Sequence, residues 1–254
     1  MKKLLAITAL SAALFFGQTA AAEEKAAEEV KPSHVEMVLV LDESGSMSDL
    51  THDTIGGFNS MIEKEKKLDV DAHVTTVLFN DQYKMLYNRR ELKDVSKMTD
   101  KDYTPGGMTA LLDAVGRTIH KMDMVAGIHR KDKGNKVLFV IITDGEENDS
   151  KEYTYADVKK LIKDRQENAG WEFIFLGANI DAAAAAENLG IGRDRAVKYK
   201  NTGSGVRANF KAVAELSDSL AKSGRVSDEW KETVEKDEDD AANKQSAAVT
   251  LHRR

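Results

Sequence analysis

The chain has 254 residues, a formal net charge of −6 at neutral pH and no cysteine. The lack of cysteine excludes structural disulfides, thiolate metal sites, a cysteine nucleophile and a lipid anchor on an N-terminal cysteine. The negative charge argues against a nucleic-acid-binding protein, which normally presents a basic face. The length allows one large domain or two small ones, and one is the better count once the two ends are set aside.

The N-terminus has the features of a signal peptide. Two lysines precede a short apolar run at residues 4–16, and small residues follow it, with an Ala-x-Ala site at 20–22. A membrane anchor is the alternative, but the run is too short to span a bilayer comfortably. The sequence therefore predicts a signal peptide over residues 1–22, an exported protein that is periplasmic or secreted, and no stable membrane span after cleavage.

Apolar runs and helical periodicities alternate along residues 35–222. Short apolar runs predict six strands, at residues 35–41, 73–79, 82–87, 136–143, 171–176 and 196–199. Apolar residues at helical spacing predict five helices, at residues 49–68, 110–122, 155–168, 182–189 and 206–220. The short turn at Asn80-Asp81 permits only antiparallel pairing of its two strands. The alternation predicts an α/β fold with a doubly wound, mostly parallel six-stranded sheet, one antiparallel strand and helices on both faces.

Charged, alanine-containing segments flank this predicted domain. Residues 23–34 are rich in Ala, Glu and Lys, and we expect a linker there because the segment has little apolar surface to bury. Residues 223–254 have few large apolar residues and a dense charge run, so we expect a disordered or weakly helical tail. Trp230 is the exception, as a candidate for docking back on the domain.

A polar stretch follows the first predicted strand. Only Glu36 interrupts the run 35–41, and Asp42-Glu43-Ser44-Gly45-Ser46 comes directly after it. Ligands bind outside the carboxyl ends of the strands in open α/β sheets. One carboxylate and two hydroxyls suit a loop around a hard cation such as Mg²⁺, Mn²⁺ or Ca²⁺. The alternative is that Asp42 or Ser44 caps the next helix.

Two later segments carry matching oxygen atoms. The apolar strand at 136–143 delivers Asp144-Gly145, and a Gly-rich loop at 104–109 ends in Thr109 just before a predicted helix. If the two strands that end in aspartate are neighbours, their carboxylates meet at one rim of the sheet. The alternative for Thr109 is again helix capping. For the acidic residues 146–149, a solvated loop is favoured over a negative rim that attracts a cation.

In this order, the residues resemble the von Willebrand factor type A domain and its metal-ion-dependent adhesion site. The family pattern is Asp-x-Ser-x-Ser, then a distant Thr after a Gly-rich loop, then Asp-Gly. The chain matches it with Asp42, Ser44, Ser46, Thr109 and Asp144. The resemblance covers roughly residues 35–220, a plausible size for one α/β domain.

The resemblance implies a function as well as a fold. It implies a Mg²⁺-like ion held directly by Ser44 and Ser46, with Thr109 joining directly or through water. Asp42 and Asp144 would act largely through water and fix the hydroxyls. Because neutral hydroxyls leave the dication under-neutralised, a protein partner can supply a Glu or Asp to it. The expectation is therefore metal-dependent protein binding, with no catalytic residue.

The alternatives are an enzyme and a structural role for the metal site. A haloacid-dehalogenase-like phosphotransferase also uses a strand-end aspartate with Mg²⁺, but it needs a second acid two residues later, where Ser44 stands. The sequence has no P-loop, no HExxH and no G-x-S-x-G motif, and its six histidines are scattered. The third possibility is an envelope or stress protein that assembles with a membrane complex and keeps the ion only for structure.

Overall fold

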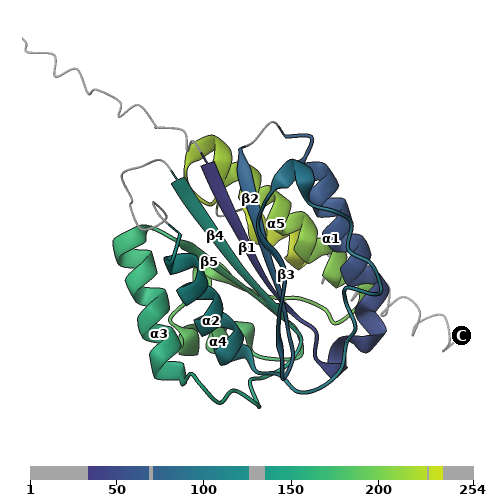
Figure 1. Ribbon diagram of the computed structural model, residues 1–254, viewed down its shortest axis with the longest axis vertical. Coiled ribbons are helices and arrows are strands. Elements are labelled where there is room, and N and C mark those ends of the chain that lie inside the picture. Colours follow the sequence, from purple (N-terminus) through teal and green to yellow (C-terminus); the bar gives the residue numbers. More distant parts are fainter. Residues whose placement is uncertain (1–33, 69–70, 126–134, 228, 237–254) are drawn as a thin grey trace, which may run out of the picture.

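The computed structural model describes residues 34–68, 71–125, 135–227 and 229–236 (Figure 1). The predicted signal peptide at 1–22, nearly all of the predicted linker at 23–34, and the tail from residue 237 lie outside the described residues. His34, which the prediction places last in the linker, is the first residue of a strand.

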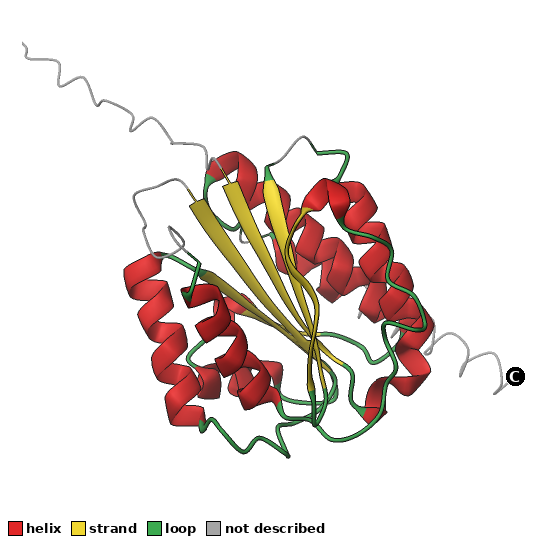
Figure 2. Ribbon diagram, viewed as in Figure 1, coloured by secondary structure: helices red, strands yellow, loops and turns green. Residues whose placement is uncertain are grey.

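A sheet forms the centre of the domain, between two groups of helices (Figure 2). It has six strands, in the order β3-β2-β1-β4-β5-β6. Of the described strands, β3 alone runs antiparallel to its neighbour. The predicted fold class is thereby confirmed. The strands are β1 (His34–Asp42), β2 (Ala72–Phe79), β3 (Tyr83–Glu91), β4 (Asn135–Thr143), β5 (Glu172–Gly177) and β6 (Ala196–Lys198).

Helices cover both faces of the sheet (Figure 1). One face packs against α1 (Thr51–Glu65) and α5 (Gly203–Ser223). The other packs against α2 (Leu111–Asp123), α3 (Tyr155–Asp164) and α4 (Ala182–Leu189). Among these helices of the described residues, none is both long and apolar enough to cross a membrane.

The near-continuous apolar run of β1 follows from burial on both faces. Met37 and Leu39 belong to the core under α1 and α5, while Val38 and Val40 belong to the core under α2 to α4. Successive side chains of a strand point to opposite faces, so a strand covered by helices on both sides needs apolar residues throughout. β1 and β4 are parallel neighbours, and the chain proceeds outward from them in opposite directions. This is the switch point at which α/β sheets form a binding crevice.

The close approach of α1 to α5 depends on a glycine. A Cβ atom built on Gly57 would lie 2.5 Å from Cδ2 of Phe210, closer than real side chains come. The helix therefore accepts the cost of glycine, about 1 kcal/mol relative to alanine, at a position where the α5 ring needs the space.

Two segments differ from the sequence prediction. The strand predicted to end at residue 87 continues to Glu91, and residues 92–94 form a short 3₁₀ helix. Within the described part of the predicted tail, residues 223–227 and 229–236, residues 230–236 are helical. Val226, Trp230 and Val234 are buried in the core beside α5. Of the two expected states, the helical one and not disorder describes residues 230–236, because three apolar side chains at a spacing of four reach the core, and the expected docking of Trp230 is confirmed.

Candidate metal centre

The first loop folds back on the end of β1. Asp42 Oδ1 accepts a hydrogen bond of 2.7 Å from the backbone N–H of Ser44. This bond turns the chain so that the hydroxyl oxygens of Ser44 and Ser46 lie 3.1 Å apart. Alternate residues of the tight loop thus present their oxygens to the same side.

Asp144 reaches this loop from the neighbouring strand end. Ser46 Oγ donates a 2.5 Å hydrogen bond to Asp144 Oδ1, across 98 positions of sequence. Thr143, which precedes Asp144, donates a 2.5 Å bond to Oδ2 of Asp42. Because β1 and β4 pair in parallel up to Leu41 and Ile142, the two aspartates leave the sheet side by side.

Thr109 lies against the same space. Its loop is tied to the first by backbone bonds from Gly106 N to Glu43 O, 2.9 Å, and from Gly45 N to Gly107 O, 3.2 Å. A Cβ atom built on Gly145 would lie 3.7 Å from Thr109 Oγ1 and 3.9 Å from Ser46 Oγ. A side chain at position 145 would therefore fill the space that the two hydroxyls flank. We call Asp42, Ser44, Ser46, Thr109 and Asp144 the oxygen cluster.

The hydroxyls of the oxygen cluster are not used for helix capping. The N-cap of α2 is Ala110, which makes no side-chain cap bond, and Glu147 Oε2 accepts from the N–H of Leu112 instead. Ser44 precedes a 3₁₀ helix, Gly45–Leu50, without capping it through its side chain. The capping alternatives for Ser44 and Thr109 therefore do not describe this structure.

The two carboxylates lie in a negative, poorly solvated environment. Asp42 and Asp144 are each 1% exposed, and in the described part of the chain no Lys or Arg forms an ion pair with either. Burial raises the pKa of Asp42, and the charge of Asp144 adds to this rise, against the lowering effect of hydrogen bonds from Thr143 and Ser44. Burial also raises the pKa of Tyr199, whose hydroxyl has no hydrogen-bond partner among the described residues.

The donor set fits a hard divalent cation. All the candidate ligand atoms are oxygens, and Mg²⁺ prefers six oxygens at about 2.0–2.1 Å, which puts adjacent ligands roughly 2.9 Å apart. The 3.1 Å between Ser44 Oγ and Ser46 Oγ is close to that separation. Asp42 and Asp144, which pair with no described Lys or Arg, supply the compensating negative charge.

Several supporting residues escaped the sequence analysis. Thr143 holds Asp42, and its position directly before Asp144 was the only signal for it. Asn201 Nδ2 donates to Asp144 Oδ2 at 3.2 Å, and Asn148 Oδ1 accepts from the N–H of Thr109 at 2.9 Å. Glu43 is 4% exposed and accepts from Thr104 of the threonine loop. These contacts join segments that are far apart in the sequence, so no local sequence pattern predicts them.

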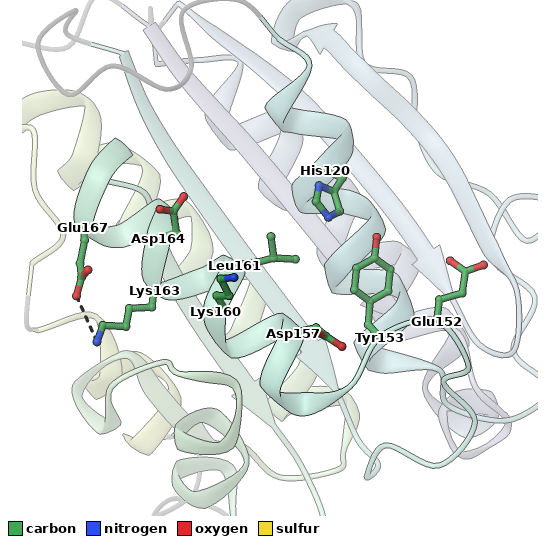
Figure 3. Close-up of a pocket in the computed structure, with 9 residues that line it drawn as sticks. All are labelled: His120, Glu152, Tyr153, Asp157, Lys160, Leu161, Lys163, Asp164 and Glu167. Carbon is green, nitrogen blue, oxygen red and sulfur yellow. Dashed lines mark ion pairs between the residues drawn. The ribbon is translucent and has the colours of Figure 1, made fainter.

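A separate hollow among the described residues lies away from the oxygen cluster. About 610 Å³ of space opens between α2 and α3, lined by side chains that include His120, Tyr153 and Asp157 (Figure 3). It shares no residue with the oxygen cluster. The candidate centre is therefore identified by its donor atoms and not by the volume of a cavity.

Comparison with solved structures supports the fold. The PilB minor pilin from Streptococcus sanguinis superposes with a TM-score of 0.53 at 13% identity, over 71% of this chain and 60% of that one. The vWF domain of the type V pili tip protein Mfa5 from Porphyromonas gingivalis gives 0.51 at 12% identity, over 78% and 99%. The chain spans 42% to 60% of the length of the first three structures that it matches.

A family model identifies the domain. No curated protein matches the chain significantly. The model described as "vWA found in TerF C terminus" matches residues 34–193, from the start of β1 to the residues just before β6. Since this match spans more than half of the sequence, the chain belongs to the von Willebrand factor type A family of the kind found at the C terminus of TerF.

Proposed function

We propose that the oxygen cluster binds a divalent cation, Mg²⁺ or alternatively Mn²⁺ or Ca²⁺, and that the protein uses it for metal-dependent binding of a partner protein. The observation that carries this proposal is the convergence of Ser44, Ser46 and Asp144 through contacts of 3.1 and 2.5 Å. The same convergence is consistent with the adhesion-site pattern of the family.

The proposed chemistry follows from the different roles of the hydroxyls and the carboxylates in the oxygen cluster. Ser44 and Ser46, with Thr109, offer neutral oxygens. Asp144 accepts from the Ser46 hydroxyl, and Asp42 holds the loop by accepting from the backbone N–H of Ser44 and from Thr143. When bound, Mg²⁺ supplies a Lewis-acidic centre whose charge these neutral ligands do not cancel. The partner we propose therefore presents an acidic side chain.

We further propose that the protein is exported, to the periplasm or beyond the cell. The predicted signal peptide at 1–22 supports this location. Two of the similar structures are described as a minor pilin and a pilus tip protein, and such proteins are consistent with an interaction role outside the cytoplasm.

The geometry favours binding over phosphoryl transfer. A nucleophilic Asp42 would need a free, accessible oxygen, but the residue is 1% exposed and both oxygens accept hydrogen bonds, from Ser44 N and Thr143 Oγ1. Ser44 also stands where the second acid of such an enzyme is needed. A phosphatase assay with Mg²⁺ on wild type and Asp42→Asn tests this alternative, and activity abolished by the substitution would support the enzyme.

The test of the proposed function begins with the cation. Calorimetric titration of the chelator-treated full chain with Mg²⁺ and Mn²⁺ is expected to give one saturable site in wild type. The double variant Ser44→Ala, Ser46→Ala is expected to lose it, whereas Ser96→Ala, a substitution at an exposed serine, is expected to keep it. Equal binding by wild type and the double variant would contradict the proposed site.

The second stage tests the partner. Immobilised wild type is expected to retain a binding protein in Mg²⁺ or Mn²⁺ and release it with a chelator, while the double variant retains none. Replacing the acidic residues of the retained protein should then abolish retention. Recovery that is unaffected by chelator would remove metal-bridged binding while leaving the cation site itself standing.

A further inference from the structure

A second polar cluster lies at the opposite end of β1 from the oxygen cluster. It consists of His34, Glu36 and His73, which we call the histidine cluster. β1 begins at His34 and ends at Asp42, so the two clusters are separated by roughly 26 Å along the strand, at about 3.3 Å per residue. Nothing in the proposed function uses the histidine cluster.

The strand geometry brings the three side chains together. His34 and Glu36 are two positions apart on β1 and therefore point to the same face. His73 stands opposite Glu36 in the parallel pairing of β1 with β2. The ligand-bearing residues thus lie on two rigid, adjacent strands and not on loops, which favours a fixed geometry.

The distances between three possible ligand atoms are close to those between the ligands of a tetrahedral zinc ion. His34 Nε2 lies 2.8 Å from Glu36 Oε1 and 2.8 Å from His73 Nδ1, and the third side of this triangle, from His73 Nδ1 to Glu36 Oε1, measures 3.3 Å. Zinc bound at about 2.0–2.1 Å in a tetrahedral site places its ligand atoms roughly 3.3 Å apart. One side of the triangle already has that length, and the other two need to open by about half an ångström.

Neighbouring residues orient the candidate ligands. Asp71 Oδ2 lies 3.2 Å from His34 Nδ1, the other ring nitrogen, so that Nε2 is left to face the cluster. A carboxylate behind a histidine is the usual support of a metal-binding imidazole. Arg89 Nε donates to both oxygens of Glu36, at 3.0 and 3.1 Å, and fixes the plane of the carboxylate.

Arg89 reaches the cluster because of an irregularity in β3. The pairing of β2 with β3 shifts register around Thr76, and Arg89 has a φ of 47°, which is uncommon for a residue other than glycine. Bulges of this kind re-aim side chains. The guanidinium lies on Glu36 Oε1 and 3.2 Å from His73 Nδ1. When a cation binds, the NH₂ group of Arg89 must move away from Glu36 Oε1 and His73 Nδ1. Arg89 Nε can still donate to Glu36 Oε2.

We propose that the histidine cluster is a second metal site, selective for a zinc-like transition-metal ion and independent of the oxygen cluster. Two imidazoles and one carboxylate are ligands that suit Zn²⁺, whereas Mg²⁺ prefers oxygens alone. The side chains of His34 and His73 are 12% and 25% exposed, which gives an ion a way in and leaves room for water as a fourth ligand. A bound ion would cross-link β1 to β2 at the end of the sheet.

Titration of the chelator-treated full chain with Zn²⁺ alone tests this site. Wild type is expected to bind one equivalent tightly. Loss of a second-shell carboxylate typically weakens metal binding 10–100-fold, so we expect about tenfold weaker binding for Asp71→Asn, whose side chain is 75% exposed. Loss of a ligand is expected to cost at least about 100-fold, in both His73→Ala and Glu36→Gln. His52→Ala removes an exposed histidine on α1 and is expected to change nothing.

Two further measurements separate the clusters and guard against unfolding. The Ser44→Ala, Ser46→Ala variant is expected to bind Zn²⁺ as wild type does, so failure of the oxygen cluster would leave this proposal untouched. In wild type, Zn²⁺ is expected to shift the imidazole NMR signals of His34 and His73 and not that of His52, whether or not the variants fold. Zn²⁺ affinity unchanged in folded His73→Ala, or no shift of these two signals, would overturn the proposal and leave an ion-paired cluster built around Arg89.

Discussion

The two ends of the sheet use opposite strategies for their buried charges. At the carboxyl end, Asp42 is the last residue of β1 and Asp144 directly follows β4, and no cationic side chain of the described residues pairs with either. At the amino end, the buried Glu36 is paired with Arg89 and two histidines on strands. One end of the sheet thus holds two buried carboxylates that no described Lys or Arg neutralises, whereas the other end neutralises its buried carboxylate with an arginine. Stability and binding should therefore respond differently to substitutions at the two ends.

The largest expected effect is a pH dependence of stability caused by Glu65, which belongs to neither cluster. This dependence would add to any pH effect measured at either end of the sheet. Glu65 of α1 is fully buried against Ser217 of α5, and burial raises its pKa to about 7. The folded state therefore binds this proton more tightly than the unfolded chain does. Its stabilising contribution is complete below pH 4.5 and is lost as pH rises through 7, by up to about 3 kcal/mol.

Glu65→Gln should remove this dependence. We expect the variant to match wild type near pH 4 and to be more stable at pH 8, as measured by urea unfolding across that range. Parallel pH profiles for the two proteins would show that Glu65 titrates normally.

The second effect comes from removing the buried ion pair between Glu36 and Arg89. Glu36→Leu leaves Arg89 without its buried partner. We expect a loss of about 2 kcal/mol in the metal-free protein, less than the 3–5 kcal/mol of a fully buried pair, because the Arg89 side chain is 31% exposed. The measurement is urea unfolding in the presence of a chelator. Glu152→Leu, which breaks the exposed pair with Arg117, is the matched control, and we expect a much smaller change from it.

The third effect concerns Mg²⁺ binding by the oxygen cluster. Thr109→Ala is expected to weaken Mg²⁺ binding about tenfold, or about 1.4 kcal/mol, with little change in stability, because its hydroxyl neither caps α2 nor bonds within the described residues. Thr109→Ser keeps the hydroxyl and should bind nearly as wild type does. Calorimetric titration of both variants measures this, and equal losses in the two would point to packing of the threonine methyl group.

The smallest expected effect is a gain in stability, whereas most substitutions of buried residues reduce stability. Asp42→Asn removes one of two neighbouring buried charges. Its amide oxygen can still accept from Ser44 N, and its NH₂ can donate to Thr143 Oγ1, which reverses the direction of that bond. We expect the metal-free protein to gain up to about 1 kcal/mol, a rise in Tm of about 2–4 °C. The same variant should no longer be stabilised by Mg²⁺. A lower Tm without metal would show that the carboxylate is needed for the loop itself.

The sequence was sufficient for the order of strands and helices along the chain, and the family resemblance supplied the grouping of the oxygen cluster. Strand ends are local features, so Asp42 and Asp144 could be placed at one rim as soon as their strands were taken as parallel neighbours. The length of β3 was missed because an edge strand with a register shift lacks the apolar alternation that marks a half-buried one. The histidine cluster was missed because His34 and His73 looked scattered, and only the pairing register joins them. Whether either cluster binds a metal ion stays a prediction.

The docking of residues 226–236 has an experimental consequence. The chain has two tryptophans, and they lie in different cores: Trp230 beside α5 on one face of the sheet, and Trp171 among the aromatic rings behind α2 to α4 on the other. Each is 2% exposed. Single-tryptophan variants would therefore give one intrinsic fluorophore per layer, and the order in which their emission shifts during denaturation would report whether the two layers melt together or in turn.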